Sequence, residues 1–233
     1  METNLDYFKG LSRKEYILKA YEIIKNEGIY AATTRRIAKE LGCSSTCLYR
    51  YFDSREELLY FAELRTLTSY INRLNEAEKH WENVWDIYVG IWDCYAREAF
   101  VNPEAYNLLF FTFNNEKLKD SILEYYNMFP EDIQYTNKFF YSMLQTSDFV
   151  GRDFEICKRC MDEGTISLKN AIQLNRIACM LYKGYFKTIL DEGINPKDVN
   201  DRVNEFISDL DISVFHLASD LQGYNGYKSY FYD

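Results

Sequence analysis

Apolar residues recur at steps of three and four along most of the chain, which is the spacing of one helix face. Ser12, with Glu15 three residues later, can form a capping box at the start of the first such segment, and Gly28 can end it. Thr33 can cap a short second segment, which Gly42 follows at once. The pattern therefore predicts two helices, of which the second is short and ends in a tight turn.

Two more helices are predicted directly after that turn. Ser44 can cap a third helix, whose apolar face contains Leu48 and Phe52. Ser54 can cap a fourth helix, which we expect to run over residues 55–80 and to link a small N-terminal domain to the rest of the chain.

The remaining three quarters of the chain also show helical periodicity, without strand alternation, repeats or low-complexity runs. Only 3 Pro and 10 Gly occur in 233 residues, and so few breakers favour long helices. Further helices are expected over residues 82–101, 103–113, 116–128, 131–162 with a break near Gly151, 168–191 and 197–221. We therefore predict an all-α fold with a small N-terminal domain and a larger helical domain.

Composition places the chain among globular proteins, with 47% hydrophobic and 27% charged residues. No run of about 18 apolar residues predicts a membrane span, and residues 1–9 lack an apolar signal core, so we expect a cytoplasmic protein without membrane contact. The 6 cysteines are scattered in a large chain, and reduced thiols are expected.

Charge is distributed unevenly along the chain. The net charge is -9, but residues 1–59 carry a net charge of +1 and the remaining residues carry -10. This distribution argues against nucleic-acid binding by the whole surface and is compatible with a local DNA contact near the N-terminus.

A short helix, a tight glycine turn and a second short helix that begins with small polar residues form a helix-turn-helix arrangement. The hydroxyl groups of Ser44, Ser45 and Thr46 stand at the start of the second of these helices. Small side chains allow a close approach to a groove, and their hydroxyls can reach base edges or phosphates. The sequence therefore predicts a DNA-binding domain.

The segment from Thr33 to Leu59 resembles the DNA-binding segment of the tetracycline-repressor (TetR) family. The residues that match the family pattern are Thr33, Ile-Ala at 37–38, Gly-x-Ser at 42–44, Leu-Tyr-x-Tyr-Phe at 48–52 and Ser-basic-Glu-x-Leu at 54–58. The resemblance covers about the first quarter of the chain and implies a regulator that binds an operator as a dimer.

The resemblance also implies the DNA contacts. Residues that open the second helix would touch the DNA backbone, the start of the third helix would enter the major groove, and the basic and tyrosine residues that follow would bind phosphates or base edges. The candidate DNA-binding residues are Thr33, Arg35, Arg36, Ser44, Ser45, Thr46, Tyr49, Arg50 and Arg55.

Three positions depart from the family pattern. Thr46 stands where Gly or Ala is usual, Cys47 stands where Thr is usual, and Arg36 replaces a common acidic capping residue. These changes bear on the operator sequence. From the residues alone, Tyr49 could instead pack the small core, and Arg50 could be a solvated charge.

Two helices near the C-terminus carry long apolar stripes that could pair with their copies in a second subunit as a four-helix bundle. Half-site binding to a palindromic operator requires two DNA-binding domains about 34–36 Å apart. The alternative is that both stripes face the core of their own subunit. The candidate interface residues are Leu174, Ile177, Leu181, Val203, Phe206, Leu210, Val214 and Leu217.

Aromatic residues are concentrated in the middle of the chain, and rings with polar tips suit a cavity for a small apolar or aromatic ligand. The resemblance implies an inducer site in the same region, whereas an ordinary core is the alternative for any single ring. The candidate ligand-binding residues are Trp85, Tyr88, Trp92, Tyr95, Phe110, Phe111, Tyr126 and Phe139.

The sequence contains few signs of a redox, metal or catalytic site. Cys157 and Cys160 have a CxxC spacing, which leaves open a redox pair, half a zinc site or two buried thiols on one helix face. Catalytic motifs are absent from the sequence, so we expect neither an enzyme nor a cofactor or metal site.

We therefore expect a DNA-binding domain over residues 1–54, a ligand-binding and dimerisation domain over 55–223 and an aromatic tail over 224–233. The predicted function is a ligand-released transcriptional repressor that acts as a homodimer. The alternative is a helical enzyme or a ligand-binding protein that does not bind DNA. The sequence leaves open whether the tail docks on the body.

Overall fold

The computed structural model describes residues 11–112, 118–133, 137–144, 146 and 148–232. The predicted helix boundaries at residues 113 and 116, and the first ten residues of the predicted DNA-binding domain, lie outside these ranges. Within them the fold is all-α, as predicted, and no strand occurs.

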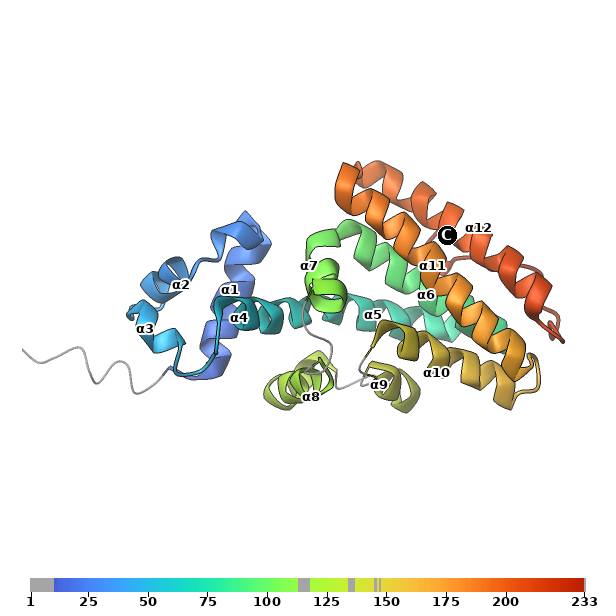
Figure 1. The fold of residues 1–233 in the computed structure, drawn as a ribbon, viewed down its shortest axis with the longest axis horizontal. Helices are drawn as coiled ribbons and strands as arrows, with labels where there is room; N and C mark the ends of the chain where they lie inside the picture. Colours follow the sequence, from blue (N-terminus) through green and yellow to red (C-terminus); the bar gives the residue numbers. More distant parts are fainter. Residues whose placement is uncertain (1–10, 113–117, 134–136, 145, 147, 233) are drawn as a thin grey trace, which may run out of the picture.

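The N-terminal domain contains α1 (Arg13–Glu27), α2 (Thr34–Glu40) and α3 (Ser45–Leu48), with a 3-10 turn, η2 (Ile29–Ala31), after α1. Figure 1 shows α2 and α3 at one end of an elongated molecule, with α1 and α4 (Arg55–Glu63) between them and the body.

Local capping explains where these helices begin. The backbone N–H of Ser12 donates to Glu15 Oε2 at 2.7 Å, which is part of the predicted capping box. The Ser54 hydroxyl caps α4 by accepting from the N–H of Glu57 at 3.1 Å. Gly42 has a φ of 70°, a left-handed conformation that glycine adopts at little cost, and it turns the chain from α2 toward α3.

The predicted helix over residues 55–80 is divided into three pieces. A 3-10 turn, η3 (Leu64–Thr66), separates α4 from α5 (Leu67–Ala77), and η4 (Glu78–His80) follows. The apolar periodicity continues through this tightening, which is why the sequence did not reveal it.

The body is arranged around α6 (Val84–Val101), which packs against α5, α10 (Phe149–Asp162), α11 (Leu168–Glu192) and α12 (Val199–Leu217). Residues 88–100 of α6 are buried on all sides, so this helix forms the centre of the core. In Figure 1, α11 and α12 lie side by side on one outer face of the body.

Shorter elements complete the body. The predicted helix over 131–162 is interrupted before Phe149, where Asp148 caps α10 by accepting from the N–H of Gly151 at 2.8 Å. The remaining elements are α7 (Pro103–Asn107), the π-helical turn η5 (Leu108–Thr112), α8 (Leu118–Met128), η7 (Pro130–Asp132), α9 (Lys138–Leu144), η8 (Pro196–Asp198) and η9 (Tyr230–Tyr232).

The aromatic tail docks on the body. Tyr224 is 3% exposed and its hydroxyl donates to Asp211, which also accepts from the N–H of Tyr227 at 3.0 Å. Ser229 donates to the buried carboxylate of Asp93 at 2.6 Å. These contacts return the chain across α12 to α6.

None of the described helices is long and apolar enough to cross a membrane.

Candidate DNA-binding surface and ligand cavity

The predicted recognition segment lies at the outer end of the molecule, away from the body (Figure 1). Ser44, Thr46, Tyr49 and Arg50 are exposed, and Ser45 is half-buried. Tyr49 is 53% exposed, so its ring does not pack in the small core. The hydroxyl-bearing start of α3 is therefore accessible to a duplex.

Other apolar residues of this segment do form the core of the N-terminal domain. Leu48 is 0% exposed and Phe52 is 2% exposed. The half-buried Tyr51 donates its hydroxyl to the carbonyl of Leu11 at 2.6 Å, which ties the segment to the residues before α1. The structure thus distinguishes the buried residues of this motif from the exposed Tyr49, for which the sequence left open a place in the core or a DNA contact.

The start of α2 presents one further cation. Thr33 is exposed, and its hydroxyl accepts from the N–H of Arg36 at 3.2 Å, so it caps the helix. Arg35 is exposed, and no ion pair involves it or Arg50 among the residues that the structure describes. Both cations are free to approach phosphates.

Two predicted phosphate-binding residues already have partners within the protein. Arg36 pairs with Glu27 at 2.8 Å and with Glu40 one helical turn away. Arg55 donates from Nε to the carbonyl of Ala32 and from Nη2 to the carbonyl of Ile29, both at 3.0 Å. Arg55 therefore fixes the loop between α1 and α2 against α4, a role that the sequence reading missed.

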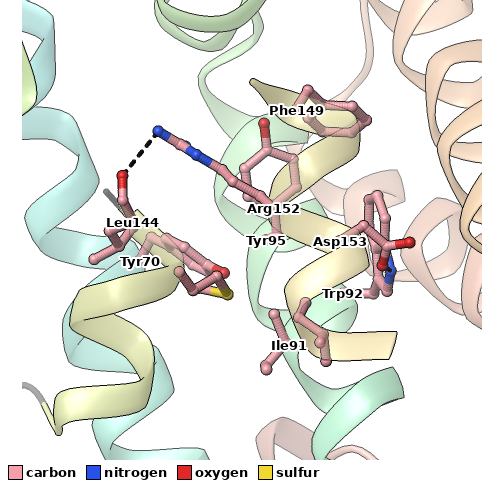
Figure 2. Close-up of a pocket in the computed structure, with 10 residues that line it drawn as sticks. Tyr70, Ile91, Trp92, Tyr95, Leu144, Phe149, Arg152 and Asp153 are labelled. Carbon is pink, nitrogen blue, oxygen red and sulfur yellow. Dashed lines mark hydrogen bonds between the residues drawn. The ribbon is translucent and has the colours of Figure 1, made fainter. Parts of the chain in front are cut away.

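A small cavity of about 40 Å³ lies in the body between α5, α6, α9 and α10 (Figure 2). Of the predicted ligand-binding residues, Trp92 and Tyr95 line it, and the other six do not. The lining residues are Tyr70, Ile91, Trp92, Tyr95, Met143, Leu144, Phe149, Arg152, Asp153 and Ile156.

The remaining predicted ligand-binding residues serve the core or lie outside the cavity. Trp85 and Tyr88 are 0% exposed, and Trp85 Nε1 donates to the carbonyl of Asp220 at 2.9 Å. Tyr126 and Phe110 are also buried. The last two, Phe111 at 36% exposure and the half-buried Phe139, lie nearer the surface.

Two charged residues in the cavity wall were not predicted from the sequence. Arg152 is 8% exposed and Asp153 is 2% exposed. Asp153 accepts from Trp92 Nε1 at 2.7 Å and from Asn175 Nδ2 at 2.8 Å. Burial raises the pKa of Asp153 to about 7, and the hydrogen bonds from Asn175 and Trp92 oppose that rise only in part.

The predicted dimer interface is mostly buried inside the subunit. Five of its eight residues are 0% exposed and cannot touch a second copy in this conformation: Leu174, Val203, Phe206, Leu210 and Val214. Ile177, Leu181 and Leu217 are partly exposed. The apolar residues that do stand on the outer face of α11 and α12 are Leu168, Ile172, Met180, Ile212 and Phe215.

The CxxC pair is inaccessible. Cys157 and Cys160 are both 0% exposed, and burial raises the pKa of the Cys160 thiol to about 12. A protonated, buried thiol is a poor nucleophile and a poor metal ligand. Among the described residues, no group of three or more histidine, cysteine or acidic side chains could hold a metal ion.

Comparisons with known proteins agree with this architecture. Residues 17–60 match the family model described as "Bacterial regulatory proteins, tetR family". The chain is 35% identical to the nucleoid occlusion factor SlmA of Vibrio cholerae over 123 residues, which are 49% of this chain and 61% of that protein. The match therefore spans less than two thirds of that relative.

Two solved structures share the fold at low sequence identity. One is FadR of Thermus thermophilus, a TetR-family transcriptional repressor in complex with lauroyl-CoA, with 16% identity and a TM-score of 0.50 over 85% of this chain and 93% of that chain. The other is SmeT, the repressor of the Stenotrophomonas maltophilia multidrug efflux pump SmeDEF, with 15% identity and a TM-score of 0.51 over 91% of this chain and 93% of that chain. Residues 17–60 thus match the TetR family model, and the chain shares the overall fold of these two regulators.

Proposed function

We propose that this protein is a transcriptional repressor that binds a palindromic operator as a homodimer in the cytoplasm and is released by a small ligand. The observation that carries the proposal is the accessible start of α3, where hydroxyl side chains precede the exposed Tyr49 and Arg50 at the end of the molecule farthest from the body. That FadR and SmeT are named as repressors, and that FadR was solved with lauroyl-CoA, supports repression and ligand control by analogy.

In this proposal the DNA contacts fall into two groups. Ser45 and Thr46 read base edges in the major groove, because they lie at the leading end of α3. Arg35, Tyr49 and Arg50 bind phosphates and set the position of the helix in the groove. Arg36 and Arg55 act indirectly, because their guanidinium groups already hold the loops of the domain.

The test begins with selection of bound fragments from genomic DNA by the purified protein, which supplies the operator. Tyr49→Phe and Arg50→Ala should weaken binding to all sequences, and removal of one phosphate contact by Arg50→Ala should reduce the slope of log K against log salt by about 1. Thr46→Ala should change the preferred base at one operator position. The discrimination between bases at that position should change by about 1–3 kcal/mol.

Arg159→Ala is the matched control, because Arg159 is a half-buried arginine on α10 that pairs with Glu163, and it should leave binding unchanged. Operator affinity and sequence preference that stay the same in all three variants of the N-terminal domain would refute the assigned contacts.

The dimer is proposed to form through the outer face of α11 and α12. Met180 is 67% exposed, Ile212 is 55% exposed and Ile172 is 52% exposed. A groove on the same face is lined by Met180, Gly184 and neighbouring side chains of α11, together with Arg202 of α12. Large exposed apolar side chains on two adjacent helices suit an isologous four-helix contact.

Met180→Glu should convert the dimer to a monomer while the helix content is retained, because the side chain is removed from the surface and not from the core. Sedimentation equilibrium measures the change. Val101→Glu is the control, since Val101 is 61% exposed and lies on α6, outside this face. A wild-type protein that sediments as a monomer, or a Met180→Glu variant that remains dimeric, would exclude this interface.

Ligand control requires a physical connection between body and N-terminal domain. The segment formed by α8 and η7 contacts α1 directly: Arg13 pairs with Glu124, and Lys14 donates to the carbonyl of Met128 at 3.1 Å. Arg65 of η3 lies 3.6 Å from Asp132 of η7. A ligand that prefers one arrangement of these elements would shift the spacing of the two DNA-binding domains.

A further inference from the structure

Two arginines are buried in the body, and they differ in their partners. Arg97 is 5% exposed and its Nε lies 2.9 Å from Oδ1 of Asp93. Arg152 is 8% exposed, and within the described ranges no carboxylate forms an ion pair with it. A buried cation without a counter-ion is costly, because protein dipoles replace its hydration only in part.

The contacts of Arg152 use only part of its guanidinium group. Nε donates to the carbonyl of Thr146 at 3.0 Å, and Nη2 donates to the carbonyl of Leu144 at 3.1 Å. The group also lies 4.7 Å from the ring centre of Phe110. A guanidinium has five N–H donors, and both hydrogens of Nη1 make no hydrogen bond to the described residues.

Tyr70 and Tyr95 line the same cavity as this cation. The Tyr70 hydroxyl lines the cavity and has no hydrogen-bond partner among the described residues. Burial raises the pKa values of Tyr70, Tyr95 and Tyr126, and the charge of Arg152 acts in the opposite direction on all three. The cavity therefore presents a positive charge together with a free donor at the Tyr70 side.

The opposite side of the cavity has a different character. Figure 2 shows the guanidinium of Arg152 reaching toward Leu144, whereas the carboxyl group of Asp153 points toward Trp92. The rings of Trp92 and Phe149 pack with their centres 5.6 Å apart and form an apolar wall. A ligand with a second negative group would place that group next to the carboxyl group of Asp153.

We propose that the cavity takes a small organic monocarboxylate, with its carboxylate on Arg152 and Tyr70 and its apolar part against Trp92 and Phe149. This inference rests on the proposed function, since it names the chemical class of the releasing ligand. A carboxylate supplies the missing counter-ion and can accept two parallel hydrogen bonds from a guanidinium.

The size of the cavity limits this ligand. A volume of about 40 Å³ holds only a few water molecules. A ligand the size of a benzene ring enters only if a side chain gives way, and Met143 is the adaptable residue of the lining. Small aromatic acids are therefore suitable probes, and large acyl chains are not.

The experiment compares benzoate with the neutral benzamide by isothermal titration calorimetry on the full chain. A hydrogen bond to a charged group is stronger than one between neutral groups. Benzoate should therefore bind about tenfold more tightly than benzamide. Arg152→Met should abolish this preference. Arg159→Met, on the same helix but paired with Glu163 at the surface, should retain it.

Tyr70→Phe provides a second variant in case Arg152→Met does not fold, because it removes only the free hydroxyl. It should weaken benzoate about fivefold and benzamide less, because the phenol donates a stronger hydrogen bond to a carboxylate than to an amide carbonyl. Benzamide binding as tightly as benzoate, no benzoate binding, or a preference that survives both Arg152→Met and Tyr70→Phe would overturn the inference. The same protein samples are tested without ligand for operator binding. If they do not bind DNA, the proposed function is wrong, whatever the result with benzoate.

Discussion

The buried carboxyl group of Asp153 should make the stability of this protein depend on pH. Asp153 is 2% exposed and accepts hydrogen bonds from Trp92 and Asn175. Burial raises its pKa from 3.8 to about 7. Between these values the unfolded chain releases a proton that the folded protein keeps, so the free energy of unfolding falls as pH rises from about 4 to about 7.

The size of the effect follows from the shift. One pKa unit corresponds to about 1.4 kcal/mol, so a rise from 3.8 to about 7 costs the folded state about 4 kcal/mol above neutral pH. The Asp153→Asn variant cannot ionise. At pH 4 it should be less stable than the wild type by about 1–3 kcal/mol, because its NH₂ group cannot accept the hydrogen bond from Asn175.

Urea unfolding at pH 4 to 8, followed by tryptophan fluorescence at one protein concentration, measures both proteins. The stability of Asp153→Asn relative to the wild type should increase by about 4 kcal/mol over this range, so that the variant equals or exceeds the wild type at pH 8. Asp162→Asn, an exposed position on the same helix, controls for the substitution itself. A difference between Asp153→Asn and wild type that does not change with pH, or that decreases as pH rises, would refute the reasoning.

Three further substitutions test packing and coupling. Gly90→Ala should cost about 1–3 kcal/mol in urea unfolding, because its Cβ would lie 2.4 Å from the ring of Trp81, and an unchanged midpoint would mean that this contact relaxes without cost. Tyr224→Ala should cost about 3–5 kcal/mol in the same assay, since a ring that is 3% exposed anchors the tail, and an unchanged midpoint would mean that the tail contributes nothing. Asp132→Asn should weaken operator binding by up to about tenfold in fluorescence anisotropy, since it loosens the contact of η7 with Arg65, and an unchanged affinity would exclude that contact from the coupling.

The N-terminal domain was predictable because its determinants are local. The capping residues Ser12 and Ser54 begin α1 and α4 where the sequence indicates. Arg55 shows the limit of this reasoning: its charge suggested a phosphate contact, but its guanidinium binds carbonyl groups on the loop before α2. That partnership depends on tertiary structure, which a local pattern does not contain.

The cavity was located only in part. Aromatic density indicated α6 and hence Trp92 and Tyr95, but Arg152 and Asp153 were overlooked because charged residues on a long helix usually face solvent. A signal was present in the sequence. Asp153 precedes Cys157 by one helical turn, and both lie on the buried face of α10.

The dimer face shows why apolar periodicity alone cannot distinguish a core from an interface. The stripe through Leu174 and Leu210 has the correct spacing and is buried within the subunit. Three other apolar residues of the same helix, Leu168, Ile172 and Met180, are exposed. A helix that packs on its own core and also pairs with a copy needs apolar residues on two faces, so its sequence shows apolar residues outside the core face as well. These exposed apolar residues are therefore the candidates for the interface, and Met180 tests this inference more directly than any residue of the buried stripe.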